Sequence, residues 1–173
     1  HKPVVRISEP IQEDGYLRWR GDIETEPGVT IPFWLLTPDD GTTTTRPLAI
    51  CAHGHDSDGW NTYAGVYRDD NHRETTLAKN GDVGVQAVKR GFVTITPATR
   101  GLAEATSIPD PKGRHGQRSC RAQLVHCLLA GRTAVGERVW DTQRVLDWAI
   151  AALPEIDATR VALLGNSGGG VLT

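Results

Sequence analysis

The sequence predicts an α/β fold, with a mostly parallel central sheet and flanking helices in a single domain over residues 1–173. Short, largely apolar segments at 48–52, 92–96 and 161–164 are typical of strands that a parallel sheet buries on both faces. These segments alternate with stretches of helical periodicity, of which 134–152 is the longest. A chain of 173 residues is long enough to bury the core of one ordinary domain.

Composition and charge argue against several classes of protein. The formal net charge is -2 and no stretch is strongly basic, so we do not expect a nucleic-acid partner. No apolar run approaches the ~20 residues of a membrane-spanning helix, so we expect no membrane partner either. The cysteines are odd in number, which indicates no disulfide framework. The sequence contains no signal for the oligomeric state.

The N-terminal third is predicted to form an irregular arm and then a pair of strands. Residues 1–15 show no periodicity. Residues 16–26 alternate between apolar and polar side chains, and 29–36 predicts a second strand. The Pro-Gly pair between them indicates a turn, so the two strands should form a hairpin. A polar surface loop is expected at 38–47.

The remaining elements follow in alternation. The strand at 48–52 leads into a polar segment, 56–80, that we expect to be irregular. Its aromatic residues either stack on a sugar face or pack within the loop: Trp60, Tyr63 and Tyr67. Helices are predicted at 82–90, 119–131 and 134–152. The last helix should turn an apolar stripe toward the core, formed by Val135, Val139, Leu146, Ile150 and Leu153.

A hexapeptide, GNSGGG at 165–170, follows the final apolar strand. Gly165, Ser167 and Gly169 match the G-x-S-x-G pattern of a nucleophile elbow, in which a serine lies at the tip of a sharp turn between strand and helix. The flanking residues must be small because the turn brings their Cα atoms close together. Gly168 would offer its backbone N–H to a developing negative charge. The alternatives are a flexible glycine-rich turn or, less suited because no lysine follows, a phosphate loop.

Two other strands end in chemically interesting residues. One runs into His53-Gly54-His55 and the other into Arg100. Ligands of α/β sheets bind at the carboxyl ends of the strands, and long loops like those after these strands usually serve a function. We therefore expect these residues to share one face of the sheet with Ser167.

The segment that begins at His53 also partly matches a metal-binding pattern, H-x-H-x-D-H. The pattern needs an aspartate at position 57 and a histidine at 58, where this chain has Ser57 and Asp58. Because the ligand set is broken, we expect no metal here.

Several segments together resemble the α/β-hydrolase superfamily, and more narrowly bacterial acetyl xylan esterases and dienelactone-hydrolase-like esterases. They are ETEPGVTIPFWLLTP, AHGHDSDGW, TRG, RVWDTQRVLDW and GNSGGG. The resemblance implies that Ser167 is the nucleophile and that the N–H groups of His55 and Gly168 stabilise the oxyanion. It implies no cofactor or metal, and it favours a secreted or periplasmic location.

We expect supporting roles for the neighbouring residues. Gly165 and Gly169 would shape the turn, and Gly54 belongs to the loop that resembles an oxyanion loop. His53 is expected to hold that loop by hydrogen bonds rather than to take part in catalysis. Arg100 is expected to anchor its own loop by an ion pair rather than to contact substrate.

The superfamily orders its triad as serine, then an acid, then histidine, but only six residues follow Ser167. We therefore expect an N-terminal part of such an enzyme, without the acid and base loops and with 160–164 as an exposed apolar edge. A substitute base would have to be His115 or His126.

The sequence thus predicts a serine esterase that forms an acyl-enzyme on a small-molecule or carbohydrate ester, of the acetyl xylan type. The alternatives are a non-catalytic hydrolase-fold chain that binds a ligand, and a peptidase or lipase-like hydrolase.

Overall fold

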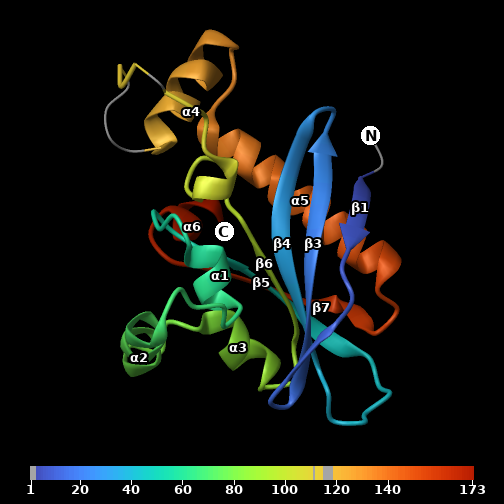
Figure 1. The fold of residues 1–173 in the computed structure, drawn as a ribbon. Helices are drawn as coiled ribbons and strands as arrows, with labels where there is room; N and C mark the ends of the chain where they lie inside the picture. Colours follow the sequence, from blue (N-terminus) through green and yellow to red (C-terminus); the bar gives the residue numbers. More distant parts are fainter. Residues whose placement is uncertain (1–2, 111, 115–118) are drawn as a thin grey trace.

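The computed structural model describes residues 3–110, 112–114 and 119–173. Its strands form one twisted sheet in the order β1-β3-β4-β6-β5-β7, with β2 also paired to β3 (Figure 1). Helix α5 (Ala134–Ala152) covers one face of the sheet, and α1 (Gly59–Tyr63) and α3 (Val83–Val88) cover the other. The strands are β1 (Val4–Ile7), β2 (Ile11–Glu13), β3 (Tyr16–Glu26), β4 (Val29–Pro38), β5 (Arg46–Ala52), β6 (Val93–Pro97) and β7 (Ile156–Gly165).

The predicted hairpin is formed by β3 and β4. Tyr16 pairs with Pro38 at its open end, and Glu24 pairs with Thr30 near the turn. Gly28 adopts a φ of 79° in that turn, a conformation that glycine accepts without a steric penalty. The inward side chains of the hairpin join the core beneath α5: Ile23, Ile31, Phe33 and Leu35.

The prediction of an irregular N-terminal arm is wrong. Residues 4–7 and 11–13 form β1 and β2, which pair antiparallel with one edge of β3. Val4, Ile7 and Ile11 are exposed and Val5 packs at the margin of the core, so backbone pairing stabilises these strands more than burial does. Pairing of this kind leaves no apolar periodicity in the sequence.

The sheet is mixed. The parallel arrangement that the sequence predicts is found in β6, β5 and β7. The N-terminal strands instead pair antiparallel with one another, and β4 pairs antiparallel with β6. Strand β7 lies at one edge of the described sheet and exposes apolar side chains there, namely Val161, Leu163 and Leu164.

The segment 56–80 is more regular than expected. It contains α1 and α2 (Asp70–Ala78), and the Asp69 carboxylate accepts a hydrogen bond from the His72 N–H at 2.7 Å to cap α2. Helix α2 buries only Thr76, so it carries no apolar stripe from which a sequence pattern could predict it. Among the described helices, none is both long and apolar enough to cross a bilayer.

The apolar stripe predicted for the last helix is partly wrong. Val135 and Ile150 are 40% and 42% exposed, although Leu146 and Leu153 do pack against the core. The buried face of α5 is instead shifted around the helix and includes charged residues: Ala134, Arg138, Asp141, Val145 and Ala149. The two charged residues occupy this face because each has a buried partner.

Arg100, on the loop after β6, is the buried partner of both Asp141 and Arg138. Its Nε donates to Asp141 Oδ2 at 2.8 Å and its Nη1 donates to Glu26 Oε1 at 2.7 Å. Thr25 Oγ1 donates to the second Asp141 oxygen at 2.6 Å. Burial alone would lower the pKa of Arg100, but these carboxylates outweigh burial and raise it. Arg138 Nε in turn donates to the Arg100 carbonyl at 2.8 Å, so the loop after β6 is fixed to α5.

We predict that Asp141→Asn lowers the free energy of unfolding by about 3 kcal/mol, because it leaves Arg100 buried without its closest carboxylate. Urea unfolding at neutral pH measures the loss. Asp147→Asn is the matched control on the same helix. It breaks the Arg144–Asp147 pair, whose carboxylate is 56% exposed, and it should cost less than about 1 kcal/mol. Equal losses in the two variants would contradict a structural role for the Arg100–Asp141 pair.

Candidate active site

Ser167 lies in the turn between β7 and helix α6 (Gly168–Leu172). Its φ of 53° and ψ of -118° place an L-residue in a strained backbone region. The residue is exposed, and its hydroxyl makes no hydrogen bond to any residue that the structure describes. A strained serine between a strand and a helix is the local geometry that the G-x-S-x-G pattern requires.

The glycines of the motif are dictated by close approach of backbones. A Cβ on Gly169 would lie 2.1 Å from the Ala52 carbonyl oxygen, at the end of β5. A Cβ on Gly165 would lie 2.3 Å from the Gly169 carbonyl oxygen. Side chains at these positions would therefore push α6 away from β5, and the turn would open.

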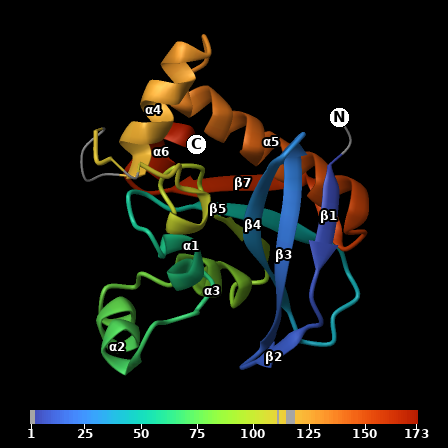
Figure 2. The same ribbon diagram turned by 45° about the horizontal axis from the view of Figure 1, so that its top comes forward.

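The loop after β5 reaches the same place. A Cβ on Gly54 would lie 2.8 Å from the Asn166 carbonyl oxygen and 2.9 Å from Ser167 Cβ. Figure 2 shows β5 and β7 running side by side toward α6, which is why their ends meet. The structure thus places Gly54 directly against the serine.

Two backbone N–H groups beside the serine have no acceptor among the described residues. One belongs to His55, and the other to Gly168, the first residue of α6. The residues are neighbours, since His55 Nδ1 lies 3.3 Å from the position of a Cβ on Gly168. Unpaired donors next to a hydroxyl are the groups that stabilise an oxyanion in acyl transfer.

A pocket of about 180 Å³ opens at this point. It is lined by the loop 53–56, by Gly59 and Tyr63 of α1, and by Asn166 and Ser167. Sequence analysis left the role of Tyr63 open and missed Gly59, whose hydrogen atoms leave room for the His53 ring. It also missed Leu102, whose Cδ1 lies 2.9 Å from the position of a Cβ on Gly168.

His53 is buried and both ring nitrogens are engaged. The Thr99 N–H donates to Nε2 at 2.9 Å, and Nδ1 lies 2.8 Å from the Gly54 carbonyl oxygen, to which it donates in the matching tautomer. Burial lowers the pKa of His53 to about 4. The ring is therefore neutral near pH 7 and connects the loops after β5 and β6.

The other sequence-predicted residues lie away from the serine or cannot be placed. Arg100 is buried among Glu26, Asp141 and Glu137 and does not line the pocket. His126 is an exposed residue of α4 (Ser119–Leu129), and His115 lies outside the described residues. Of the loop aromatics, Trp60 is buried and stacks on Trp34, with ring centroids 6.1 Å apart.

Known proteins with similar structures are esterases. An assigned acetyl xylan esterase from Bacteroides fragilis matches 99% of this chain with a TM-score of 0.77 and 19% identity, and the match covers 44% of that protein. A methylesterase matches 98% of this chain with a TM-score of 0.64 and 23% identity, over 31% of its own length. A glucuronoyl esterase from Solibacter usitatus matches 98% of this chain with a TM-score of 0.59 and 14% identity, over 47% of its own length.

These matches show that the chain shares the fold of these esterases. The chain spans less than half the length of each of these three proteins. No protein-family model and no curated protein matches its sequence. Within the described ranges, no three His, Cys, Asp or Glu residues are placed to share a metal ion.

We predict that alanine at two adjacent glycines of the motif changes the free energy of unfolding by different amounts. Gly169→Ala places a methyl group against the Ala52 carbonyl and should lower the free energy of unfolding by about 3 kcal/mol. Gly170→Ala meets its nearest atom at 3.3 Å and gains helix propensity, so its effect should stay within about 1 kcal/mol. Thermal unfolding distinguishes them, and equal destabilisation would argue against close contact between α6 and β5.

The buried His53 predicts an acid-sensitive stability. Its folded pKa of about 4 lies below the usual 6.5, so between these values the unfolded chain binds a proton that the folded chain does not. Stability is full above about pH 6.5 and should fall as the pH drops toward 4. We expect the difference between wild type and His53→Gln, measured by denaturant unfolding, to change across this window with a slope approaching one proton. Parallel curves would show that His53 does not titrate in this way.

Proposed function

We propose that the chain carries the nucleophile and the oxyanion donors of a serine ester hydrolase. The observation that supports this most is the strained turn at Ser167, which holds an unpaired hydroxyl against Gly54. The free N–H groups of His55 and Gly168 lie beside it. A nucleophile and two donors in this arrangement suit the tetrahedral intermediate of acyl transfer.

In the proposed reaction, Ser167 Oγ attacks the carbonyl carbon of an ester and gives up its proton to a base. The carbonyl oxygen takes the negative charge and accepts hydrogen bonds from His55 and Gly168. Collapse expels the alcohol, which takes a proton, and leaves an acyl-enzyme on Ser167. Water then attacks the acyl carbon and gives one of its protons to the serine oxygen as that oxygen leaves, which releases the carboxylic acid and restores Ser167.

His53 is unsuited to be the base, because both its nitrogens are already hydrogen-bonded and its ring is buried. No histidine in the described part of the chain is hydrogen-bonded to the Ser167 hydroxyl. The proton must therefore pass to a group that approaches the exposed hydroxyl from its solvent side. We expect this chain alone to react slowly for that reason.

We further propose a carbohydrate ester as substrate, with an acetyl group as the acyl part. The naming of similar structures as acetyl xylan, glucuronoyl and methyl esterases supports an ester substrate, and the name acetyl xylan esterase supports the carbohydrate and its acetyl group. The small pocket, of about 180 Å³, suits an acyl part of this size. A non-catalytic ligand-binding chain remains the alternative, and the following experiment separates the two.

We predict that a fluorophosphonate probe labels the wild-type chain at Ser167 and that Ser167→Ala abolishes the labelling. Peptide mass spectrometry identifies the modified residue. Hydrolysis of p-nitrophenyl acetate, which we expect to be slow in this chain, should fall to the uncatalysed rate in the same variant.

Ser57→Ala is the matched control, because Ser57 is an exposed serine of the neighbouring loop and should leave the labelling unchanged. Labelling that persists in Ser167→Ala, or that moves to Ser57, would refute the proposed nucleophile. An unlabelled wild type would favour the non-catalytic alternative.

A further inference from the structure

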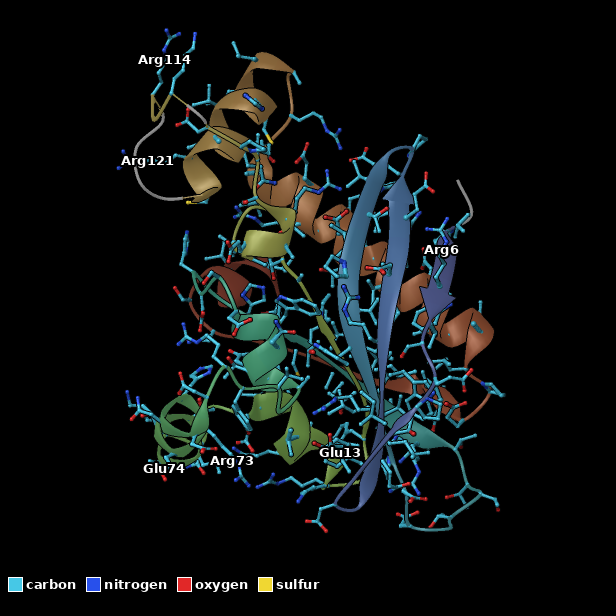
Figure 3. All side chains as sticks on the ribbon, in the orientation of Figure 1. Arg6, Glu13, Arg73, Glu74, Arg114 and Arg121 are labelled. Atoms are coloured by element: carbon cyan, nitrogen blue, oxygen red, sulfur yellow. The ribbon has the colours of Figure 1, made fainter. Side chains whose placement is uncertain are left out.

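A second cavity, of about 420 Å³, lies beside β2, β3, α2 and α3 and shares no lining residue with the Ser167 pocket. Its volume falls within the ~300–1,000 Å³ of small-molecule sites. Figure 3 shows Glu13 of β2 and Arg73 of α2 at the same end of the molecule, on the two sides of this region. The residues that determine its chemistry are Glu13, Tyr16, Tyr67, Arg73, Asp82 and Val85.

Tyr16 lines this cavity and is largely buried. Its side chain is 5% exposed, and its ring packs with Leu36 and Val85. The hydroxyl oxygen lies 3.2 Å from the position of a Cβ on Gly65, which also lines the cavity and has a φ of 76°. A side chain at position 65 would therefore crowd the Tyr16 hydroxyl as well as strain the backbone.

The Tyr16 hydroxyl has a proton to donate. Its hydrogen-bonding neighbour is Arg18, a residue with donors only, so the tyrosine oxygen acts there as the acceptor. Among the described residues no acceptor is paired with the Tyr16 O–H. Burial, aided by the charge of Glu13, raises the pKa of Tyr16 to about 12, so the hydroxyl keeps its proton at any ordinary pH.

The charges around the cavity are close to balanced. Glu13 pairs with Arg18 at 2.6 Å, and Asp14 pairs with Lys89 at 2.9 Å. Two groups remain at the wall. The Asp82 carboxylate accepts a hydrogen bond from Gln86 Nε2 at 2.9 Å, and the Arg73 guanidinium has no ion pair with a described residue. A charged ligand would meet a group of its own sign on one side, whereas a neutral ligand would not.

We propose that this cavity binds a neutral sugar ring. One sugar hydroxyl accepts the Tyr16 proton, a second accepts from Arg73, and a third donates to Asp82. The Tyr67 ring and the Val85 side chain offer apolar surface to the C–H groups of the sugar. Binding here needs no covalent chemistry and does not rest on the proposed esterase activity.

The test is a titration of the wild-type chain with xylotriose, a neutral pyranose oligomer, followed by calorimetry or amide chemical shifts. Tyr16→Phe removes one hydroxyl and keeps the buried ring, so affinity should fall about two- to tenfold. Arg73→Ala changes an exposed residue and should weaken binding to a similar extent. Melting curves confirm that both variants are folded.

Arg121→Ala is the matched control for Arg73→Ala, because it removes an exposed arginine of α4 that lines neither cavity. It should leave xylotriose affinity unchanged, while Tyr16→Phe should still be labelled by fluorophosphonate. Absence of saturable binding up to about 10 mM overturns the proposal. So does affinity that falls as much in Arg121→Ala as in Arg73→Ala, or tighter binding of glucuronate or inorganic phosphate than of xylotriose.

Discussion

The whole site depends on a close contact between backbone segments at the point where β5 and β7 end. It is possible only because no side chain stands between Gly169 and the Ala52 carbonyl, or between Gly54 and Ser167. The strained conformation of Ser167 costs about 1–3 kcal/mol. The parallel pairing of β5 with β7 offsets this cost, together with the hydrogen bonds from Gly169 N–H to Asn166 O at 2.8 Å and from Val171 N–H to Ser167 O at 3.1 Å.

Hydrogen bonds between the loops after β5 and β6 support this contact. The Thr99 N–H holds His53, and His53 holds the Gly54 carbonyl, so the loop after β5 follows the loop after β6. That second loop is in turn fixed to α5 through Arg100 and Asp141. Helix α5, which carries Asp141, thereby helps to determine where the loop beside the serine lies.

Local patterns in the sequence predict the elements whose burial is periodic. The alternation in β3, the apolar run of β5 and the G-x-S-x-G spacing each reflect a constraint within a few residues. Strands β1 and β2 are not predicted, because backbone pairing with β3, more than burial, stabilises them. The sequence does not predict the buried face of α5, because a charged residue on a helix is ordinarily expected in solvent. Asp141 is buried because it pairs with Arg100, which lies 41 residues away in the sequence.

The site shows the same division between local and long-range information. The turn at Ser167 follows from its own glycines, whereas the neighbours of Gly168, namely Leu102 and His55, come from two distant loops. The chemistry of an aromatic residue is likewise decided by the fold. Three aromatic residues of one short segment have three different surroundings: Trp60 is buried in the core, Tyr63 lines the Ser167 pocket and Tyr67 lines the second cavity.

The segment from Tyr63 to Tyr67 forms part of the wall of both cavities: Tyr63 lines the Ser167 pocket, and Gly65 and Tyr67 line the second cavity. Arg18 of β3 donates to the carbonyl oxygens of Ala64 and Gly65 at 3.0 and 3.3 Å, so the wall is anchored to the sheet at its middle. Ala64 is also buried against Tyr16. Because this segment is held to the sheet, we expect a ligand in one cavity to leave the lining of the other cavity unchanged.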